Sequence, residues 1–332
     1  MYAGADGFRI IGSRQVGDRK MDVSIIIVNW NTKQLLRDCL TSVYERAGDV
    51  DYEIIVVDNA STDGSSEMVK NDFRQVILIE NTENRGFAAA NNQAMAVAKG
   101  RYVLLLNSDT VVLDNAIANT VRFADENPQA AVTGCRVLNP DRTVQRTCFM
   151  FPSILNMLLS STYLYKLFPK NSFFGREQMT WWDRSDVRQV DVVTGCFMLV
   201  RREAIEKVGV MDERFFMYGE ETDWCYRFWK NGWEVMFAPV GEIIHLGGQS
   251  AAQKPVAMIV QLRLSILKFI RKHHCWSAHL IARFLVVFFF AVRLPVWLAI
   301  AFVRPAARGK AVIKMKAYST GMMEALFGRV NL

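Results

Sequence analysis

The chain has 332 residues, of which 51% are hydrophobic, enough for one large α/β domain with an appendage or for two domains. Its six cysteines include no CxxC pair, which excludes the usual zinc-finger spacings and predicts reduced, cytosolic thiols. Residues 1–21 are rich in glycine and charge and lack the apolar core of a secretory signal, so we expect a flexible leader.

The formal net charge of +7 is unevenly distributed along the chain. Residues 254–332 hold thirteen lysines and arginines against one acidic residue, Glu324, so residues 1–253 are net acidic. The basic residues of this C-terminal segment alternate with runs of Phe, Leu, Val and Trp and do not form a separate polar patch. This pattern favours an anionic membrane surface as partner and argues against nucleic acid.

In chain order, four apolar runs predict buried strands at residues 23–28, 53–58, 76–80 and 102–106. Each of the first three runs is followed by a polar turn and a stretch of helical character. Such alternation is typical of a doubly wound α/β sheet with parallel strands. Neither a G-x-G-x-x-G nor a P-loop sequence follows the first run, which argues against a dinucleotide site and against a P-loop enzyme.

Polar side chains stand at the carboxyl end of every predicted strand, the edge at which open α/β sheets bind their ligands. They are Trp30 and Asn31, Asp58, Asn84 and Arg85, and, after the fourth strand, Asn107, Ser108 and Asp109. A carboxylate at the position of Asp109 is well placed to hold a metal-bound diphosphate. Taken alone, the same three residues also fit an ordinary Asx turn.

The second half of the chain is less regular. Residues 151–174 are apolar and aromatic, and they fit either a core helix or the lining of a groove for a greasy acceptor. Residues 190–200 predict another strand. Three carboxylates then stand within four positions, and they fit a solvated helix start as well as a cluster with raised pKa values: Glu220, Glu221 and Asp223. His245 precedes two glycines, and a lone histidine is more often structural than a ligand.

The C-terminal segment predicts an amphipathic helix at residues 256–272 and a twenty-residue apolar run at 284–303, about 30 Å long as a helix. Arg293 at the centre of this run costs about 2.5–3.5 kcal/mol in a bilayer, and Pro295 interrupts the helix. One basic stripe is predicted on the helical wheel, formed by His279, Arg283, Arg293, Arg304 and Arg308. We therefore favour a monotopic helix in the headgroup layer, with a membrane span or packing on the globular domain as alternatives.

Seven segments of the chain resemble, in order, those of glycosyltransferase family 2, and within it the rhamnosyltransferase-like group of bacterial polysaccharide assembly. They span residues 22–250 and read VSIIIVNWN, EIIVVDNASTDGS, ENRGFAAANN, YVLLLNSDT, VTGCFMLVRREA, FFMYGEETDWCYR and HLGGQS. The resemblance implies a GT-A-like, doubly wound mixed sheet at residues 22–253 and a helical, membrane-associated tail at residues 254–332.

The resemblance also implies a nucleotide-sugar site. Trp30 would flank the nucleobase, Asp58 would hydrogen-bond it, and Asp63 and Arg85 would support the nucleoside and the phosphates. In the family's metal-binding Asp-x-Asp motif the first place is held by Asn107, the second by Ser108 and the last by Asp109.

The same resemblance implies a metal ligand and a catalytic base. His245 matches a position that reaches the metal, Mg²⁺ or Mn²⁺, in several relatives. Glu221 holds the place of the catalytic base, where the family usually has Asp, and Asp223 is the alternative base. A glutamate moves the carboxylate oxygen by about one bond length, a shift that costs about 100-fold if nothing compensates it.

The expected function is inverting transfer of a sugar from a nucleotide diphosphate donor, with dTDP-L-rhamnose as the preferred donor, to a lipid-linked glycan. It is expected at the cytoplasmic face of the bacterial inner membrane. An inactive nucleotide-sugar-binding scaffold is the alternative, because Asn107 and Glu221 depart from the family pattern. A nucleotidyltransferase is a third reading, but it needs a Gly-rich basic loop after the first strand, and NWNTKQLL offers none.

Overall fold

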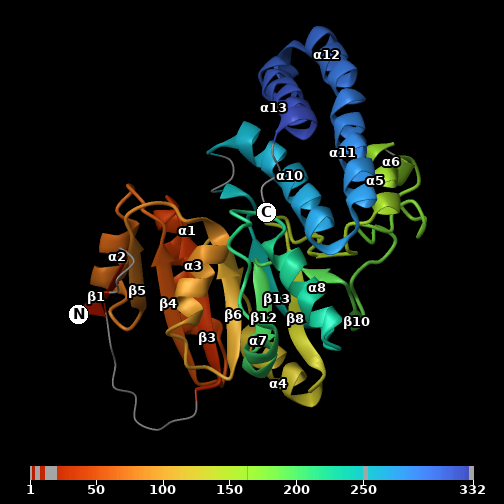
Figure 1. Ribbon diagram of the computed structural model, residues 1–332. Helices are drawn as coiled ribbons and strands as arrows, with labels where there is room; N and C mark the ends of the chain where they lie inside the picture. The colour runs from red at the N-terminus through yellow and green to blue at the C-terminus, as the bar shows by residue number, and fades with distance from the viewer. Residues whose placement is uncertain (1, 4–7, 12–20, 163, 250–252, 329–332) are drawn as a thin grey trace. The chain divides into compact units, whose positions relative to one another are not determined.

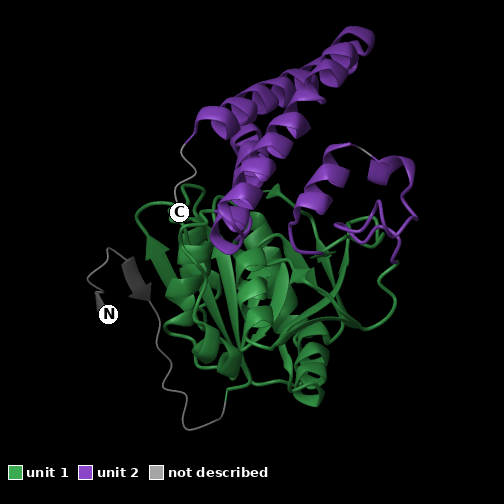
Figure 2. Ribbon diagram, turned by 45° about the vertical axis from the view of Figure 1, so that its right-hand side comes forward, with its two compact units in different colours: residues 1–149, 183–216, 220–250 green, residues 150–182, 217–219, 251–332 purple. Residues whose placement is uncertain are grey.

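The computed structural model describes residues 2–3, 8–11, 21–162, 164–249 and 253–328 (Figure 1). The chain divides into two compact units (Figure 2). Unit 1 comprises residues 1–149, 183–216 and 220–250, and unit 2 comprises residues 150–182, 217–219 and 251–332. The tail predicted from residue 254 therefore belongs to a larger unit that also takes in the apolar segment at 150–182.

Unit 1 is built on a mixed sheet whose first half is parallel. β3 (Val23–Asn29) pairs in parallel with β4 (Tyr52–Asp58) and with β6 (Tyr102–Asn107), and β5 (Ile77–Asn81) pairs in parallel with β4. These elements confirm the four predicted strands. Their aliphatic side chains are buried almost without interruption, as expected for parallel strands covered on both faces.

The second half of the sheet introduces antiparallel pairs. β12 (Phe197–Arg201) is antiparallel to both β6 and β8 (Ala130–Leu138), and β13 (Glu234–His245) is parallel to β8. The short β7 (Thr110–Val112) pairs with the end of β13, in a register that sets Thr110 opposite His245. This pairing brings the end of β6 and the end of β13 together.

Shorter strands complete the sheets. β10 (Arg188–Gln189) pairs with β13, and β9 (Cys148–Phe149) pairs with β11 (Val192–Val193) in a separate two-stranded sheet. The predicted flexible leader lies largely outside the described residues. Within it, β1 (Tyr2–Ala3) pairs with β2 (Phe8–Ile11), and β2 pairs antiparallel with β5, so residues 8–11 extend the sheet.

Helices pack on the sheet of unit 1 (Figure 1). They are α1 (Lys33–Arg46), α2 (Ser65–Asp72), α3 (Gly86–Met95), α4 (Ala116–Glu126), α7 (Arg202–Val208) and α8 (Glu220–Lys230). α1 buries Leu36, Leu40 and Val43 in the same core as Ile25 and Ile27 of β3. Each such side chain stabilises the fold by about 1.5–3 kcal/mol.

Unit 2 is helical among its described residues. Its elements are α5 (Ile154–Ser161), α6 (Leu164–Leu167), α10 (Pro255–His273), α11 (Trp276–Ala291), α12 (Leu294–Val303), the 3₁₀ turn η1 (Pro305–Ala307) and α13 (Arg308–Phe327). The stretch Trp276–Val303 is long and apolar enough to cross a membrane. Its most apolar 18-residue window has a mean hydropathy of 2.4, and 17% of that window is buried.

The predicted basic stripe is wrong at its centre, because Arg293 is only 3% exposed. Its Nη1 donates to the carbonyls of Ser161 (3.2 Å) and Phe289 (2.8 Å), and its Nη2 donates to the carbonyl of Ser160 (2.9 Å). Ser160 and Ser161 end α5, where the helix dipole favours a cation. Arg293 therefore ties the junction of α11 and α12 to α5 and does not face lipid headgroups.

Arg283 is a second exception to the stripe. Its guanidinium donates to the carbonyls of Ala325 (2.9 Å) and Leu326 (3.0 Å), and so caps the C-terminal end of α13. A helical wheel drawn for an isolated helix misses this contact, because α13 packs along α11. Arg304 and Arg308 are exposed.

Candidate functional site

The loops after β3 and β4 are tied together at the carboxyl edge of the sheet. Asn29 and Asp58 are register partners, and Asn29 Nδ2 donates to Asp58 Oδ1 at 2.9 Å. The backbone amide of Ser61 donates to Asp58 Oδ2, also at 2.9 Å. Asp58 is 3% exposed, so its carboxylate is held rigidly. Each carboxylate oxygen has two lone-pair sites, so each can still accept from one more donor.

Ser108 links the end of β6 to the same network. Thr32 Oγ1 donates to Asn29 Oδ1 at 2.6 Å, so it has no proton left for Ser108. The contact of 2.9 Å between the two hydroxyls therefore runs from Ser108 to Thr32. Ser108 is buried, and its hydrogen bond connects the loop after β6 to the loop after β3.

Asp63 joins two helix starts. Its carboxylate accepts from the amide of Lys33 (2.8 Å), the first residue of α1, and from the amide of Ser65 (3.0 Å), the first residue of α2. Burial acts to raise the pKa of Asp63, but hydrogen bonds from the Ser65 hydroxyl and from these amides outweigh it and hold the pKa below its usual value. Asp63 thus stays ionised and fixes the loops on either side.

Trp30 lies in the first of these loops and is half-buried. The next residue, Asn31, has a positive φ of 52°, and Ala60 in the loop after β4 has a φ of 62°. Asn31 Oδ1 accepts from the amide of Thr62 at 2.7 Å, which holds the two strained loops against each other. The backbone of the loop that carries Trp30 is therefore held in place by the neighbouring loop.

Arg85 precedes α3, whose start is fixed by a close backbone approach. Gly86 has a φ of 82°, and a Cβ atom there would lie 2.3 Å from the carbonyl oxygen of Phe216. The amide of Phe87 donates to that same oxygen at 2.8 Å. No hydrogen bond or ion pair is found between the half-buried guanidinium of Arg85 and the described residues. Arg85 at a helix N-terminus thus suits an anionic ligand.

The candidate metal ligands meet where β6, β7 and β13 come together. His245 Nε2 lies 3.2 Å from Asp109 Oδ1 and 3.2 Å from Asn107 Nδ2. The side chains of Asp109 and His245 are 9% and 12% exposed. Within the described ranges, no three Asp, Glu, His or Cys side chains gather as a metal site. The candidate ligands at this point are therefore the pair Asp109 and His245, with the amide of Asn107 beside them.

These residues fit a divalent cation. Two ligand atoms at right angles on an octahedral ion, each about 2.1 Å from it, lie about 3.0 Å apart. The 3.2 Å between Asp109 Oδ1 and His245 Nε2 is close to this spacing. A divalent ion held by these two residues would supply positive charge, and Mg²⁺ in phosphate-transfer sites is typically bound by one or two protein carboxylates.

Glu221 stands in the first turn of α8. Its Oε1 accepts from the amide of Gly195 at 3.2 Å, and burial raises the pKa of its carboxyl above the usual value. A Cβ atom at Gly195 would lie 2.9 Å from the ring of Phe87 and 3.3 Å from Glu221 Oε1, so only glycine fits beside this pair. The sequence pattern did not single out Gly195, although a glycine just before an apolar strand marks such a close approach.

The candidate base and the candidate metal motif contact two adjacent residues: the amide of Gly195 donates to Glu221 Oε1, and Cys196 contacts Asn107. Burial raises the pKa of the Cys196 thiol to about 12, and the charges of both carboxylates contribute to the rise. The backbone carbonyl of Cys196 accepts from the amide of Asn107 at 3.2 Å. The metal candidates and the candidate base thus belong to one site.

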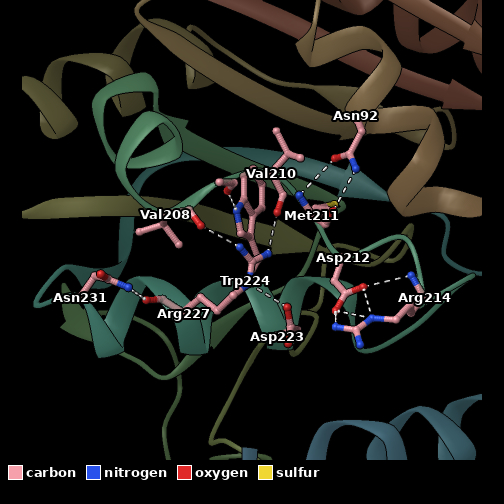
Figure 3. Close-up of polar contacts among 11 residues, drawn as sticks. Asn92, Val208, Val210, Met211, Asp212, Arg214, Asp223, Trp224, Arg227 and Asn231 are labelled. Atoms are coloured by element: carbon pink, nitrogen blue, oxygen red, sulfur yellow. Dashed lines mark hydrogen bonds and ion pairs between the residues drawn. The ribbon is translucent and has the colours of Figure 1, made fainter. Parts of the chain in front are cut away.

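Asp223 has a different environment. Its side chain is 0% exposed and accepts from Arg227 Nε at 2.9 Å (Figure 3). Arg227 also donates to the carbonyls of Val208 (3.1 Å) and Val210 (2.7 Å), and so ties α8 to the end of α7. The burial and the ion pair favour a structural role for Asp223 over that of a base.

The sequence of the chain matches a known family and known enzymes. The profile of "Glycosyl transferase family 2" matches residues 24–209. A relative from Mycobacterium tuberculosis (strain H37Rv), named N-acetylglucosaminyl-diphospho-decaprenol L-rhamnosyltransferase, is 27% identical over 240 residues, 68% of this chain and 78% of the relative. A poly(ribitol-phosphate) beta-glucosyltransferase from Bacillus spizizenii is 32% identical over 158 residues, 46% of this chain and 25% of the relative.

The fold also has a counterpart among solved structures. The mannosyltransferase PcManGT from Pyrobaculum calidifontis, determined in complex with GDP-Man and Mn²⁺, superposes with a TM-score of 0.57 and 17% sequence identity, over 94% of this chain and 89% of that one. This likeness confirms the GT-A type of mixed α/β sheet. The chain therefore belongs to glycosyl transferase family 2, is similar to its rhamnosyltransferases, and is a glycosyltransferase.

Proposed function

We propose that this glycosyltransferase moves L-rhamnose from dTDP-L-rhamnose to a lipid-linked saccharide, with inversion at the anomeric carbon. The observation that carries the proposal is geometric: Glu221 accepts from the amide of Gly195, and the next residue, Cys196, accepts from Asn107, two residues before the Asp109 that faces His245. The name of the M. tuberculosis relative supports the sugar and the diphospho-polyprenol acceptor.

Asp109 and His245 would hold a divalent ion, Mg²⁺ or Mn²⁺, with Asn107 as a neutral neighbour. When bound, such an ion supplies positive charge to the leaving diphosphate. The guanidinium of Arg85 adds a second positive charge. Trp30 and Asp58, held by the loop network, would bind the nucleobase, and Asp63 and Ser108 keep those loops in place.

Glu221 would act as the base that takes the proton from the acceptor hydroxyl as it attacks. A general base works best when its pKa approaches the working pH, and burial moves the pKa of Glu221 in that direction. In this proposal Asp109 holds the ion and Glu221 acts as the base, so neither carboxylate attacks the sugar. A single displacement with inversion then follows.

Unit 2 would bind the cytoplasmic face of the bacterial inner membrane, where the lipid-linked acceptor lies. Exposed apolar side chains mark the surface that would enter the bilayer interface: Trp276, Leu280 and Phe284 on α11, Phe302 and Val303 at the end of α12, and Val312 and Ile313 on α13. The first three follow one another at four-residue steps and share a helix face. The exposed Arg304 and Arg308 add charge that suits anionic headgroups.

A donor screen on the full chain tests the proposed sugar. We expect dTDP-L-rhamnose with Mn²⁺, at about 100 times its Kd, to raise the Tm by roughly 5 °C. UDP and GDP sugars should give smaller shifts, and the wild type should transfer rhamnose to a GlcNAc-diphospho-polyprenol with the anomeric configuration reversed. A chain that binds the donor but transfers nothing would support the scaffold reading. If another nucleotide sugar stabilises the chain selectively, that sugar replaces dTDP-L-rhamnose as the proposed donor.

Vesicle binding tests the membrane surface. The double variant Phe302→Ser and Val303→Ser should weaken sedimentation with vesicles of anionic lipid at least about 10-fold, because these side chains are 74% and 77% exposed. Val210→Ser, at a 45% exposed position in unit 1, is the matched control and should bind as the wild type does. Equal binding by the double variant would place the membrane contact elsewhere.

A further inference from the structure

Gln145 lies beside His245, although nothing in the sequence pattern singles it out. Its Oε1 is 2.6 Å from His245 Nδ1. β8 runs parallel to β13 as far as the pair Leu138 and Ile244, one residue before His245. The chain then turns back, and the amide of Gln145 donates to the carbonyl of Val137 at 2.8 Å. The turn after β8 thus places the side chain of Gln145 next to the imidazole of His245.

The direction of each hydrogen bond in this turn follows from Asp141. Hydrogen bonds from the hydroxyl and the amide of Thr143 lower the pKa of Asp141, so its carboxylate is ionised and only accepts. Thr143 Oγ1 therefore donates to Asp141 at 2.6 Å, and its oxygen accepts from Asn139 Nδ2 at 2.9 Å. Asn139 Oδ1 then faces Gln145 and accepts from Gln145 Nε2 at 2.9 Å.

A second contact supports the same orientation of the Gln145 side-chain amide. Gln145 Nε2 also donates to the backbone carbonyl of His245 at 3.2 Å, so both oxygens that face Nε2 are acceptors. Oε1 must then accept a hydrogen bond from the N–H of His245 Nδ1. In a neutral imidazole with its proton on Nδ1, Nε2 carries a lone pair. That lone pair faces Asp109 Oδ1, 3.2 Å away.

We propose that Gln145 is a positioning residue: it fixes the Nδ1-protonated form of His245 and so prepares Nε2, together with Asp109, to bind a divalent cation. This inference rests on the metal site of the proposed function. Hydrogen-bonded partners of metal-binding histidines orient the ring and raise its basicity in the same way.

Asn107 gains a role from this arrangement. Two lone pairs 3.2 Å apart, on Asp109 and His245, repel each other unless a cation lies between them. Asn107 Nδ2 lies 3.2 Å from Nε2 and donates to it when no ion is bound. An aspartate at position 107 would add a second negative charge and no donor. The asparagine thus satisfies His245 in the ion-free protein.

Binding of Mn²⁺ to the full chain tests the role of Gln145, measured from the paramagnetic resonance signal of free Mn²⁺. Gln145→Leu should weaken binding about 10–100-fold. Gln145→Glu keeps an acceptor for Nδ1 and should stay within a few-fold of the wild type. Gln34→Leu, at an exposed glutamine of α1, is the matched control and should not change the affinity. Wild-type affinity in Gln145→Leu would overturn the inference.

The tautomer of His245 gives a second readout, independent of metal binding. The chain has four histidines, so ¹⁵N labelling of imidazoles gives few signals, and His245→Ala assigns the one of interest. We expect the Nδ1–H form in the metal-free wild type and a mixture in Gln145→Leu. An Nε2–H form in the wild type would overturn the inference. If Asp109→Asn leaves Mn²⁺ affinity unchanged while the Nδ1–H form is observed, the proposed metal site fails and the role of Gln145 in fixing the tautomer stands.

Discussion

Asp109→Asn is expected to lower the rate of sugar transfer about 10²–10³-fold, the usual loss when one electrostatic contact to a developing charge is removed. The substitution keeps the size of the side chain and removes the charge that would hold the ion. The ion-dependent part of donor binding should disappear with it. Initial rates at saturating donor, with Mn²⁺ varied, measure both effects.

The Tm of Asp109→Asn distinguishes the loss of an ion ligand from a folding defect. An asparagine at position 109 would bring an amide donor towards the lone pair of His245 Nε2, 3.2 Å from the present carboxylate oxygen, so the Tm should not fall. Asp114→Asn changes an exposed carboxylate just beyond β7 and is the matched control, with wild-type rates expected. A Tm that falls together with the rate would contradict the assignment of Asp109 as an ion ligand.

Glu221→Gln is expected to lower the rate of transfer about 10²–10⁴-fold, the range typical of a lost general base. The amide oxygen of the glutamine still accepts from the amide of Gly195, so the geometry is kept while the basic group is lost. Glu206→Gln, on the exposed side of α7, is the control. Donor affinity should not change, because Glu221 would act on the acceptor.

The pH dependence of transfer follows from the raised pKa of Glu221. The base must be ionised, so the rate falls as the pH drops through its pKa. Because burial raises that pKa, the acidic limb should lie above the range of an ordinary glutamate, about 4.3. A limb at or below that value would contradict Glu221 as the base.

The free energy of unfolding should change with pH in the opposite direction to the rate of transfer: the contribution of Glu221 to stability grows as the pH drops. A raised pKa in the folded chain means that protonation of Glu221 stabilises the fold. This contribution is fully present below the unfolded-state pKa and is lost as the pH rises through the folded-state pKa. Glu221→Gln removes a charge whose partial desolvation is unfavourable, so its Tm at neutral pH should equal or exceed that of the wild type.

Local sequence patterns sufficed for the parallel half of the fold. The strands β3 to β6 are continuous aliphatic runs with polar ends, and a parallel sheet brings those ends to one edge, so Asp58 and Asp109 could be placed from the sequence. The proximity of Asp109 and His245 depends on the pairing of β7 with β13, which no local pattern specifies. That pair was expected only from the family resemblance.

Other features could not be predicted because tertiary contacts decide them. Arg293 looked like part of a lipid-facing stripe, but the carbonyls at the end of α5 hold it in the interior of unit 2. Asp223 is the alternative base on the family pattern, and its ion pair with Arg227 is a contact that the sequence did not predict. Gln145 has no sequence signature, because its role comes from a turn that follows β8 and lies beside β13.

Anomalous diffraction from Mn²⁺ in crystals grown with dTDP gives the most direct test of the proposed site. We expect one manganese peak within coordination distance of Asp109 and His245 and next to the diphosphate of dTDP, and we expect its loss in Asp109→Asn. A diphosphate bound without manganese, or a manganese peak that contacts neither Asp109 nor His245, would contradict it.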